Sequence, residues 1–422
     1  MSETPEDSAI PARRAGGPAW LLLAGAFGAF TMASGLMQSY TVYLVAFIDA
    51  FGWSRGEASI AYSVSQVVAG GSSPFVGALV DRLGPRRLLV LGSALLVLGL
   101  AGSALVHALW QIVVLYGVVM TIGANFLGLV VFVPILSRQF ERRRGMAISV
   151  VQSANGFGRA LSAPLVQFGV SGIGWRATYL AQAALMALVA VPLALVFRRV
   201  DPTRRSVPAS SPLSLPAAAA APRVGWRLAE ASRTPHFWLL FAVYLFTGLG
   251  SFFVSLHQLA FAITIGFPPI YAAEVLGAGA FLAVFGTIGT GTLSDYIGRE
   301  AAAILAYGFS IVGVGCALLI TRPTQHLLLW LHACFFGVTW GARGPAITAK
   351  TADLFPGPQL GRILGVITIG SGLGAALGSW GAGAVFDLTH SYRVAFLLSI
   401  ASYLCGGVAF WALRRPPVRR RA

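Results

Sequence analysis

"GALVDRLGPRR", residues 77–87, returns 214 residues later as "GTLSDYIGRE", residues 291–300. Two further pairs of stretches repeat with offsets of 216 and 217 residues: "GMAISVVQSANGFG" at 145–158 with "GRILGVITIGSGLG" at 361–374, and "WRATYL" at 175–180 with "YRVAFL" at 392–397. Matches at a nearly constant offset indicate an internal duplication. The chain is therefore expected to contain two copies of one structural unit.

The composition of the chain indicates that lipid surrounds both copies. Hydrophobic residues make up 56% of the chain and charged residues 10%, whereas an ordinary soluble domain carries about 25% charged residues. A membrane-spanning helix needs roughly 20 mostly apolar residues, and a spanning β-strand only about 10 residues of alternating character. The apolar stretches are too long and too uniform for a barrel. They predict an all-α membrane protein with twelve transmembrane helices, near 20–48, 56–80, 88–107, 110–137, 145–170, 176–197, 236–265, 272–294, 301–321, 326–350, 361–386 and 392–413.

A polar segment divides the predicted spans into two sets of six. "RRVDPTRRSVPASSPLSLPAAAAAPR", which begins at residue 198, is rich in Pro, Ser, Ala and Arg. This composition predicts a flexible linker and not a span. The predicted organisation is a cytoplasmic tail at 1–19, an N-terminal six-helix bundle at 20–197, a cytoplasmic linker at 198–235, a C-terminal six-helix bundle at 236–413 and a basic cytoplasmic tail at 414–422.

The basic residues are distributed unequally between the two ends of the predicted spans. Twenty-four of the thirty Lys and Arg residues lie in the tails, the linker and alternate loops. Four lie at the opposite ends of the spans: Arg55, Arg176, Arg322 and Arg393. Because cytoplasmic loops carry the excess of Lys and Arg, both termini are expected in the cytoplasm, with the chain in the cell (inner) membrane. The net charge of +16 therefore reflects membrane topology and does not indicate a nucleic-acid partner.

The loop between the second and third predicted spans carries the pattern Gly77-x-Leu79-x-Asp81-Arg82-x-Gly84-x-Arg86-Arg87. Together with its second copy and the six-plus-six arrangement, this pattern resembles the signature loop of the major facilitator superfamily. The resemblance covers essentially the whole chain. It implies two helical bundles that rock around a central site, with helices one, four, seven and ten lining the cavity. The acid of such a loop can pair with basic residues or cap a neighbouring helix, although a static turn is the alternative. The predicted conformational latch comprises Gly77, Asp81, Arg82, Gly84, Arg86, Arg87 and Arg142, with Asp295 and Arg299 in the second half.

Further matches resemble one branch of that superfamily, the monocarboxylate porters. "AGGPAW" at 15–20 is similar to the entry motif of the branch, and "FERRRGMAISVVQSANGFG" at 140–158 to its second motif. The chain also departs from the branch. Gln38 stands where animal members have a lysine, and the stretch 281–292 lacks their acid and arginine. Any charge chemistry of the substrate site must therefore have moved to other positions.

Two arginines, Arg159 and Arg343, lie inside predicted spans. All fourteen Asp and Glu residues lie in tails, loops or helix ends, so neither arginine has a predicted carboxylate partner. A charge at membrane depth is costly and marks a functional position by default. A guanidinium binds a carboxylate through two parallel hydrogen bonds. We therefore expect the two arginines, Arg343 first, to hold an anionic substrate; a tie from Arg343 to backbone carbonyls is the alternative.

Neutral polar residues are expected to orient the rest of the substrate, although each can instead make a contact between helices. These candidates are Gln38, Tyr40, Asn125, His257, Gln258 and Trp340. Since no acid is buried, His257 or His332 is the candidate for carrying a proton. In the alternative scheme, arrival of the anion itself permits reorientation of the bundles, which would also serve anion exchange.

These inferences predict a secondary active transporter of small organic anions, monocarboxylates foremost, that works by alternating access with proton symport or anion exchange. An efflux pump for amphiphilic compounds and a non-transporting receptor on the same fold are the alternatives. The sequence shows no paired acids, nucleophile–base set, P-loop or metal-ligand spacing, so no enzyme, cofactor or metal site is expected. The expected partners are the anion, protons and the lipid bilayer, and the chain is expected to act as a monomer.

Overall fold

The computed structural model describes residues 17–140, 144–197, 226–357 and 359–414, and a few side chains within helices, those of Asp81 and Asp295 among them, also lie outside the description. Nearly all of the described chain is helical. Hydrocarbon offers no hydrogen-bond partner, so each backbone N–H and C=O must find one within its own segment. The helical elements are α1 (Gly17–Gln38), α2 (Tyr40–Phe51), α3 (Arg55–Leu83), α4 (Pro85–Ser103), α5 (Leu109–Ile112), the π-helical η1 (Val113–Met120), α6 (Thr121–Phe126), α7 (Leu129–Gln139), α8 (Arg144–Val196), α9 (Leu228–Ala231), α10 (Pro235–Ser255), α11 (Gln258–Ile265), α12 (Pro269–Ile297), α13 (Arg299–Leu319), α14 (His326–Val338), α15 (Arg343–Leu354), α16 (Leu360–Thr389) and α17 (Arg393–Ala412).

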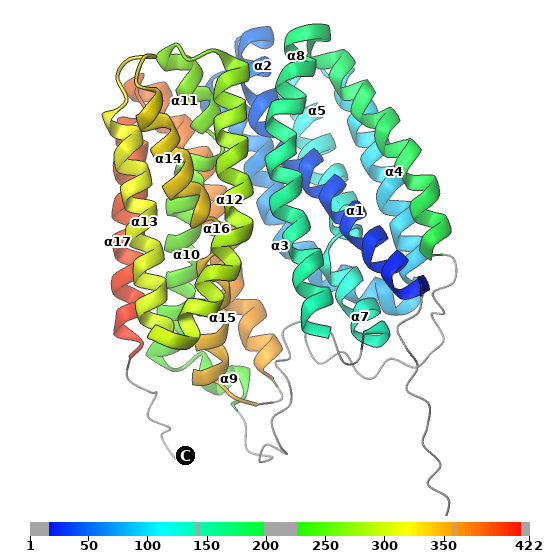
Figure 1. Cartoon of the computed structure of the whole chain (residues 1–422), viewed down its shortest axis with the longest axis vertical. Coiled ribbons are helices and arrows are strands. Elements are labelled where there is room, and N and C mark those ends of the chain that lie inside the picture. The colour runs from blue at the N-terminus through cyan, green and yellow to red at the C-terminus, as the bar shows by residue number, and fades with distance from the viewer. Residues whose placement is uncertain (1–16, 141–143, 198–225, 358, 415–422) are drawn as a thin grey trace, which may run out of the picture.

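The helices form two bundles that stand side by side (Figure 1). The elements from α1 to α8 make up the N-terminal bundle, and those from α10 to α17 make up the C-terminal bundle. α2 and α11 lie at the side that is uppermost in Figure 1, the upper side, together with the bend in α8. α7, α9 and α15 lie at the opposite, lower side, where α17 ends.

The duplicated loop has the same backbone conformation in both bundles. Gly84 joins α3 to α4 with φ 78° and ψ 157°, and Gly298 joins α12 to α13 with φ 87° and ψ 155°. Positive φ values of this kind suit glycine and strain other residues. The repeat found in the sequence therefore extends to the geometry of the loop.

Nine helical segments among the described residues are long and apolar enough to cross a membrane: Ala19–Phe51, Pro85–Ser103, Leu109–Val133, Val150–Val196, Pro235–Ile265, Pro269–Thr290, Arg299–Leu319, Leu360–Thr389 and Arg393–Ala412. One of them, Val150–Val196, contains two helices, because Gly174 interrupts α8 with a φ of 81°. The second predicted span coincides with α3, and the tenth with α14 and α15, which a turn at 339–342 separates. The all-helical membrane fold is confirmed, whereas the number twelve and the location of the termini stay predictions.

The last part of the predicted linker, from residue 226, packs against the lower end of the C-terminal bundle. The rings of Trp226 and Phe355 lie 5.3 Å apart, and the backbone N–H of Leu228 donates to Oε1 of Gln359 at 2.9 Å. α9 therefore rests on the loop between α15 and α16. Most of the predicted linker, residues 198–225, lies outside the described residues.

Glycine lets helices of one bundle touch through their backbones. A Cβ added to Gly374 of α16 would collide with the carbonyl oxygen of Leu245 on α10 and would lie 2.8 Å from the backbone nitrogen of Leu249. Opposite it, a Cβ added to Gly248 would lie 2.6 Å from the carbonyl oxygen of Ser371. Apolar side chains gain little by leaving lipid, so close packing of small residues is a main source of helix association in membranes.

We expect Gly374→Ala to destabilise the protein by about 1–3 kcal/mol, because the added methyl group overpacks the contact between α10 and α16. The matched control is Gly365→Ala on the same helix, where an added Cβ meets nothing within 4 Å. This control should be neutral or stabilising by about 0.5–1 kcal/mol, since alanine suits a helix better than glycine. Thermal unfolding of both variants in one detergent checks the pair. Equal unfolding temperatures would contradict the packing argument.

Candidate functional site

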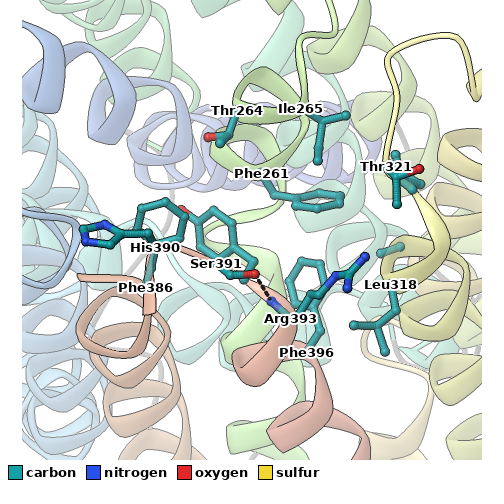
Figure 2. Close-up of a pocket in the computed structure, with 13 residues that line it drawn as sticks. Phe261, Thr264, Ile265, Leu318, Thr321, Phe386, His390, Ser391, Arg393 and Phe396 are labelled. Carbon is teal, nitrogen blue, oxygen red and sulfur yellow. Dashed lines mark hydrogen bonds between the residues drawn. The ribbon is translucent and has the colours of Figure 1, made fainter. Parts of the chain in front are cut away.

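A pocket of about 230 Å³ opens at the upper end of the C-terminal bundle (Figure 2). Its walls come from α11, the end of α13, the loop after α16 and the start of α17. The rings of Phe261 and Phe396 face it, and Arg393 lies along it. None of the residues predicted to bind substrate lines this pocket, and the two arginines inside the spans lie outside it.

Arg159 lies on α8 at the boundary between the two bundles. Its side chain is buried, with 9% of the residue exposed, and its guanidinium carbon lies 3.8 Å from the centre of the Trp340 ring, which belongs to the other bundle. Nη1 is buried without a hydrogen-bond partner. Within the described part of the chain, no carboxylate pairs with Arg159. The site thus holds a buried positive charge that only an aromatic face partly compensates.

Aromatic side chains from both bundles continue away from Arg159. The Trp340 ring lies 5.3 Å from the ring of Phe252 on α10, which in turn lies 5.9 Å from the ring of Tyr62 on α3. The Tyr62 hydroxyl is close enough to both Arg159 and Gln38 to interact with them. One positive group, two polar groups and three apolar ring faces therefore meet between the bundles. Such a set can bind the charged end of a small ligand and enclose its apolar part.

Arg343 occupies a different place, inside the C-terminal bundle. It is 3% exposed, and its Nη1 donates to Oγ of Ser310 at 2.6 Å and to the carbonyl oxygen of Ala306 at 3.4 Å. Nη2 donates to Oγ of Ser251 at 3.2 Å. The guanidinium also lies between two tyrosine rings, 4.6 Å from that of Tyr403 and 5.0 Å from that of Tyr307. Only Nε is buried without a partner. These contacts match the structural tie that was the alternative for this residue.

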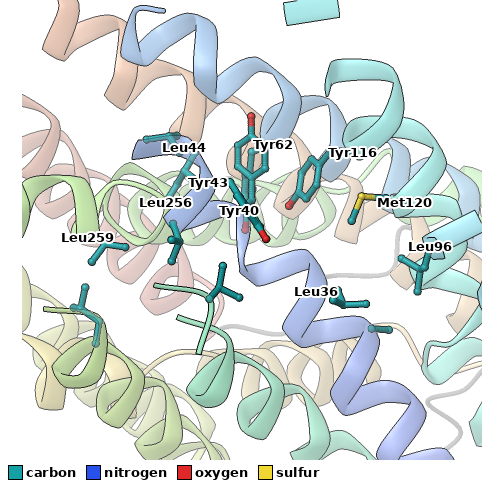
Figure 3. Packing of buried hydrophobic residues seen from close by; sticks show 14 of the residues in the cluster. Leu36, Tyr40, Tyr43, Leu44, Tyr62, Leu96, Tyr116, Met120, Leu256 and Leu259 are labelled. Atoms are coloured by element: carbon teal, nitrogen blue, oxygen red, sulfur yellow. The ribbon is translucent and has the colours of Figure 1, made fainter. Parts of the chain in front are cut away.

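Two predicted neutral ligands make contacts within the N-terminal bundle. Tyr40 is fully buried, stacks on Tyr116 with ring centres 4.2 Å apart and donates its hydroxyl hydrogen to the Ala58 carbonyl oxygen at 2.7 Å (Figure 3). Asn125 on α6 donates to the Ala69 carbonyl oxygen at 3.1 Å and to Oγ of Ser72 at 2.7 Å, both on α3. The side-chain hydroxyl of Tyr40 and amide of Asn125 are therefore engaged by the bundle itself.

His257 lies at the upper side, between the bundles, and both ring nitrogens have partners. Nε2 lies 2.9 Å from the carbonyl oxygen of Ser379 and 3.2 Å from Oγ of Ser59, and Nδ1 lies 3.3 Å from the hydroxyl of Tyr392. Gln258 follows it as the first residue of α11 and is half-buried. The partners of His257 thus include none of the rings around Arg159.

His332 is buried within the C-terminal bundle. Its Nδ1 lies 2.9 Å from the carbonyl oxygen of Gly313 on α13, and its ring stacks on Phe336 with centres 5.5 Å apart. Nε2 is buried without a partner. Of the two predicted proton carriers, His332 is therefore the one with an unused ring nitrogen.

The predicted latch at the lower side is described only in part. Arg82, Arg86 and Arg87 are exposed. The side chains of Asp81 and Asp295 lie outside the described residues, as does all of Arg142. Gly77 is half-buried on α3. Arg299 forms an ion pair with Asp353 at 2.7 Å, which joins α13 to α15 within one bundle. The proposed pairing of Asp81 with basic residues thus stays a prediction.

Sequence reasoning missed several residues that contact the site. Tyr62 and Phe252 look like ordinary apolar residues of a span, and no local spacing shows that they face another bundle. Ser251 and Ser310, the partners of Arg343, are 92 and 33 residues from it. The available signals were the two intramembrane charges without predicted counterions, Arg159 and Arg343, and the polar candidates Gln38 and Trp340.

Comparison with known proteins identifies relatives along almost the whole chain. Monocarboxylate transporter 13 of Rattus norvegicus is 26% identical over 397 residues, which is 93% of this chain and 88% of the relative. The oxalate:formate antiporter of Oxalobacter formigenes is 24% identical over 406 residues, 94% of this chain and 92% of the relative. These relatives confirm the resemblance to the monocarboxylate porter branch. They are transporters, and not enzymes.

Solved structures and a family model agree on the fold. A mutant of the nucleoside transporter NupG superposes with a TM-score of 0.76 at 12% identity, covering 94% of this chain and all of the other. A bacterial homologue of the human lysosomal transporter Spinster gives 0.65 at 15% identity, covering 95% and 99%. The model of the Major Facilitator Superfamily matches residues 19–349. The chain is therefore a multi-pass integral membrane protein and a transporter that belongs to the Major Facilitator Superfamily.

Proposed function

We propose that this transporter moves a small organic anion, a monocarboxylate foremost, and that Arg159 contacts the carboxylate. The observation that carries the proposal is the buried guanidinium of Arg159, which lies between the bundles with Nη1 unpartnered. Leaving a charged donor buried without an acceptor is costly. A carboxylate arriving between the bundles would accept that hydrogen bond and neutralise the charge.

The surroundings of Arg159 suit a ligand with one charged end and a short apolar body. Trp340 and Phe252 present ring faces from the C-terminal bundle, and Tyr62 presents one from the N-terminal bundle. Gln38 and the Tyr62 hydroxyl offer hydrogen bonds to a second polar group, such as the hydroxyl of a hydroxy acid. Because these residues come from both bundles, a bound ligand would touch both, as alternating access requires.

Arg343 is less suited than Arg159 to contact the anion. Its two Nη atoms already donate to Ser310, Ala306 and Ser251, so only Nε is free to bind a ligand. Arg343 begins α15, directly after the turn at 339–342 that separates α15 from α14. We therefore assign it the task of holding the broken helix against α10 and α13.

The names of the relatives support an anionic substrate. One is called a monocarboxylate transporter and another an oxalate:formate antiporter, and the carboxylate is what these compounds share. The rest of the architecture is also proposed: twelve crossings, domains of six spans joined by a cytoplasmic linker, both termini in the cytoplasm, the inner membrane as location, and a monomer as working unit.

Two coupling schemes are compatible with the site. In proton symport, His332 is the better carrier, because its Nε2 is unpartnered whereas both nitrogens of His257 are engaged. In anion exchange, the arriving carboxylate itself compensates Arg159 and permits the bundles to reorient. Uptake with and without an inward proton gradient separates the two schemes.

Replacement of Arg159 tests the substrate proposal. Purified protein in liposomes is supplied with labelled formate, acetate, lactate, oxalate and benzoate, with and without a proton gradient. We expect at least one of them to accumulate, and Arg159→Ala to raise its KM at least about thirtyfold, because a buried charge-assisted hydrogen bond is lost. Arg159→Lys should also be impaired, since an ammonium group cannot replace the planar fork.

The matched control is Arg176→Ala, which removes an equal charge from an exposed position next to the bend in α8 at the upper side. It should transport normally. If Arg159→Ala transports like this control, Arg159 does not contact the substrate. If no carboxylate moves in any variant while the protein binds one of them, the receptor alternative holds; uptake of amphiphilic compounds alone would favour efflux.

A second experiment separates the roles of the two arginines. We expect Arg343→Met to lower the unfolding temperature by about 5 °C, because Ser310, Ser251 and the carbonyl oxygen of Ala306 each lose a buried hydrogen bond from the guanidinium. Arg159→Met should unfold no earlier than the wild type, because no described group depends on its hydrogen bonds. Thermal unfolding without substrate measures both. Equal destabilisation by the two variants would contradict the assignment of Arg343 as the structural tie.

A further inference from the structure

The hydrogen bonds that join the two bundles come from one place. Among the described residues, all of them involve the first turns of α3, between Arg55 and Ser63. Their partners lie on α11 and in the turn before it, on α16, and in the loop before α17, at the upper side of the molecule. The other contacts between the bundles are apolar or aromatic, so these bonds are the directional part of the interface.

Asp387, near the end of α16, caps the start of α3 from the opposite bundle. Its Oδ1 accepts a hydrogen bond from the backbone N–H of Arg55 at 2.9 Å, and its Oδ2 accepts one from that of Gly56 at 2.8 Å. These are the first two residues of the helix, whose amides have no partner within it. A carboxylate there also compensates the positive end of the helix dipole. The other two cap bonds of α3 are local, between Ser54 and Glu57.

Two glycines allow this contact by bringing the backbones together. A Cβ added to Gly383 of α16 would lie 2.5 Å from the carbonyl oxygen of Arg55 and 2.7 Å from the nitrogen of Gly56. A Cβ added to Gly56 would lie 2.9 Å from Oδ2 of Asp387. The bundles can therefore close at the upper side only where these two glycines meet, which fixes the position of the carboxylate.

The side chain of Arg55 extends the contact across the C-terminal bundle. Its guanidinium carbon lies 3.9 Å from the centre of the Phe386 ring, Nη2 donates to Oγ1 of Thr264 at 2.8 Å, and Nη1 donates to the hydroxyl of Tyr392. The Tyr392 hydroxyl can then donate to Nδ1 of His257. With its proton on Nε2, a neutral His257 donates to the carbonyl oxygen of Ser379 and accepts from Tyr392 at Nδ1, so no proton has to enter or leave for the closed arrangement to persist.

The residues that hold Arg55 have open space behind them. Thr264, Phe386 and Tyr392 also line the pocket of about 230 Å³ shown in Figure 2. Their side chains can therefore shift without repacking a solid core when Arg55 withdraws. These three residues are therefore in close contact with Arg55 on the side that faces the N-terminal bundle, and they border open space on the other side.

We propose that Asp387 and Arg55 are positioning residues of an upper latch, which keeps the substrate site closed to the upper side and must part once in every transport cycle. The bonds of the latch cross between the bundles, and bundles that rock break such bonds while those within each bundle persist. Asp387 thereby sets how often the upper side opens. The inference rests on the alternating access of the proposed function and not on the identity of the substrate.

The opening frequency can be measured by labelling a buried cysteine. Ser59 is fully buried beneath the latch, so Ser59→Cys should react with a bulky hydrophilic maleimide only when the bundles part. In lipid nanodiscs and without substrate, we expect Asp387→Asn to speed this reaction about tenfold, because two charge-assisted hydrogen bonds are weakened. Labelling of the parent chain, with Cys316, Cys334 and Cys405 only, is subtracted.

Two controls decide between a latch and a general loss of stability. Glu57→Gln removes one negative charge from the same helix start, where Glu57 caps only its own helix; it should leave labelling of Cys at position 59 within twofold of the parent. Ser93→Cys places a reporter in the core of the N-terminal bundle, at a residue 3% exposed, and its labelling should not respond to Asp387→Asn. The latch is overturned if Asp387→Asn acts like Glu57→Gln, or if both reporters accelerate equally. Because the assay contains no substrate, its failure leaves the carboxylate proposal standing, and failed uptake leaves the latch standing.

Discussion

Hydrocarbon offers no hydrogen-bond partner and no counterion, and this constraint organises the protein at every level. It forces the backbone into helices that satisfy their own amides. It removes most of the hydrophobic drive between helices, so that association depends on close approach at glycines such as Gly248 and Gly374. It also leaves polar groups few choices: a neighbouring hydroxyl, a carbonyl oxygen, an aromatic face or a ligand.

The two intramembrane arginines show how differently one residue type can meet that constraint. Arg343 finds hydroxyls, a carbonyl oxygen and two tyrosine rings within its own bundle. Arg159 lies against the face of Trp340, near the Tyr62 hydroxyl, and keeps an unpartnered nitrogen between the bundles. The first arrangement is self-sufficient. The second is incomplete without another molecule, which is the property expected of a binding site and not of a packed core.

Much of the fold was predictable, because its signals are local or repeated. The apolar stretches gave the helices, and the duplicated loop anticipated the matching conformations at Gly84 and Gly298. The placement of side chains was less predictable. Trp340 lies only three residues before Arg343 in the same predicted span, yet its ring lies on Arg159 of the other bundle. His257 was expected near the substrate and lies instead beneath the cap of α3. Which way a residue faces depends on helices hundreds of residues away, and a single sequence carries no record of that.

The separation of the bonds between the bundles from the residues around Arg159 has a consequence for how such a transporter can diversify. The contacts of Arg55 and Asp387 include no residue of the aromatic set, although Tyr62 of that set lies on α3 only seven residues after Arg55. Substitutions at one place can therefore alter the speed of the cycle, and substitutions at the other its selectivity. Natural selection can adjust the turnover rate and the substrate selectivity one at a time. A lineage that acquires a new substrate therefore need not change the residues that control the conformational cycle.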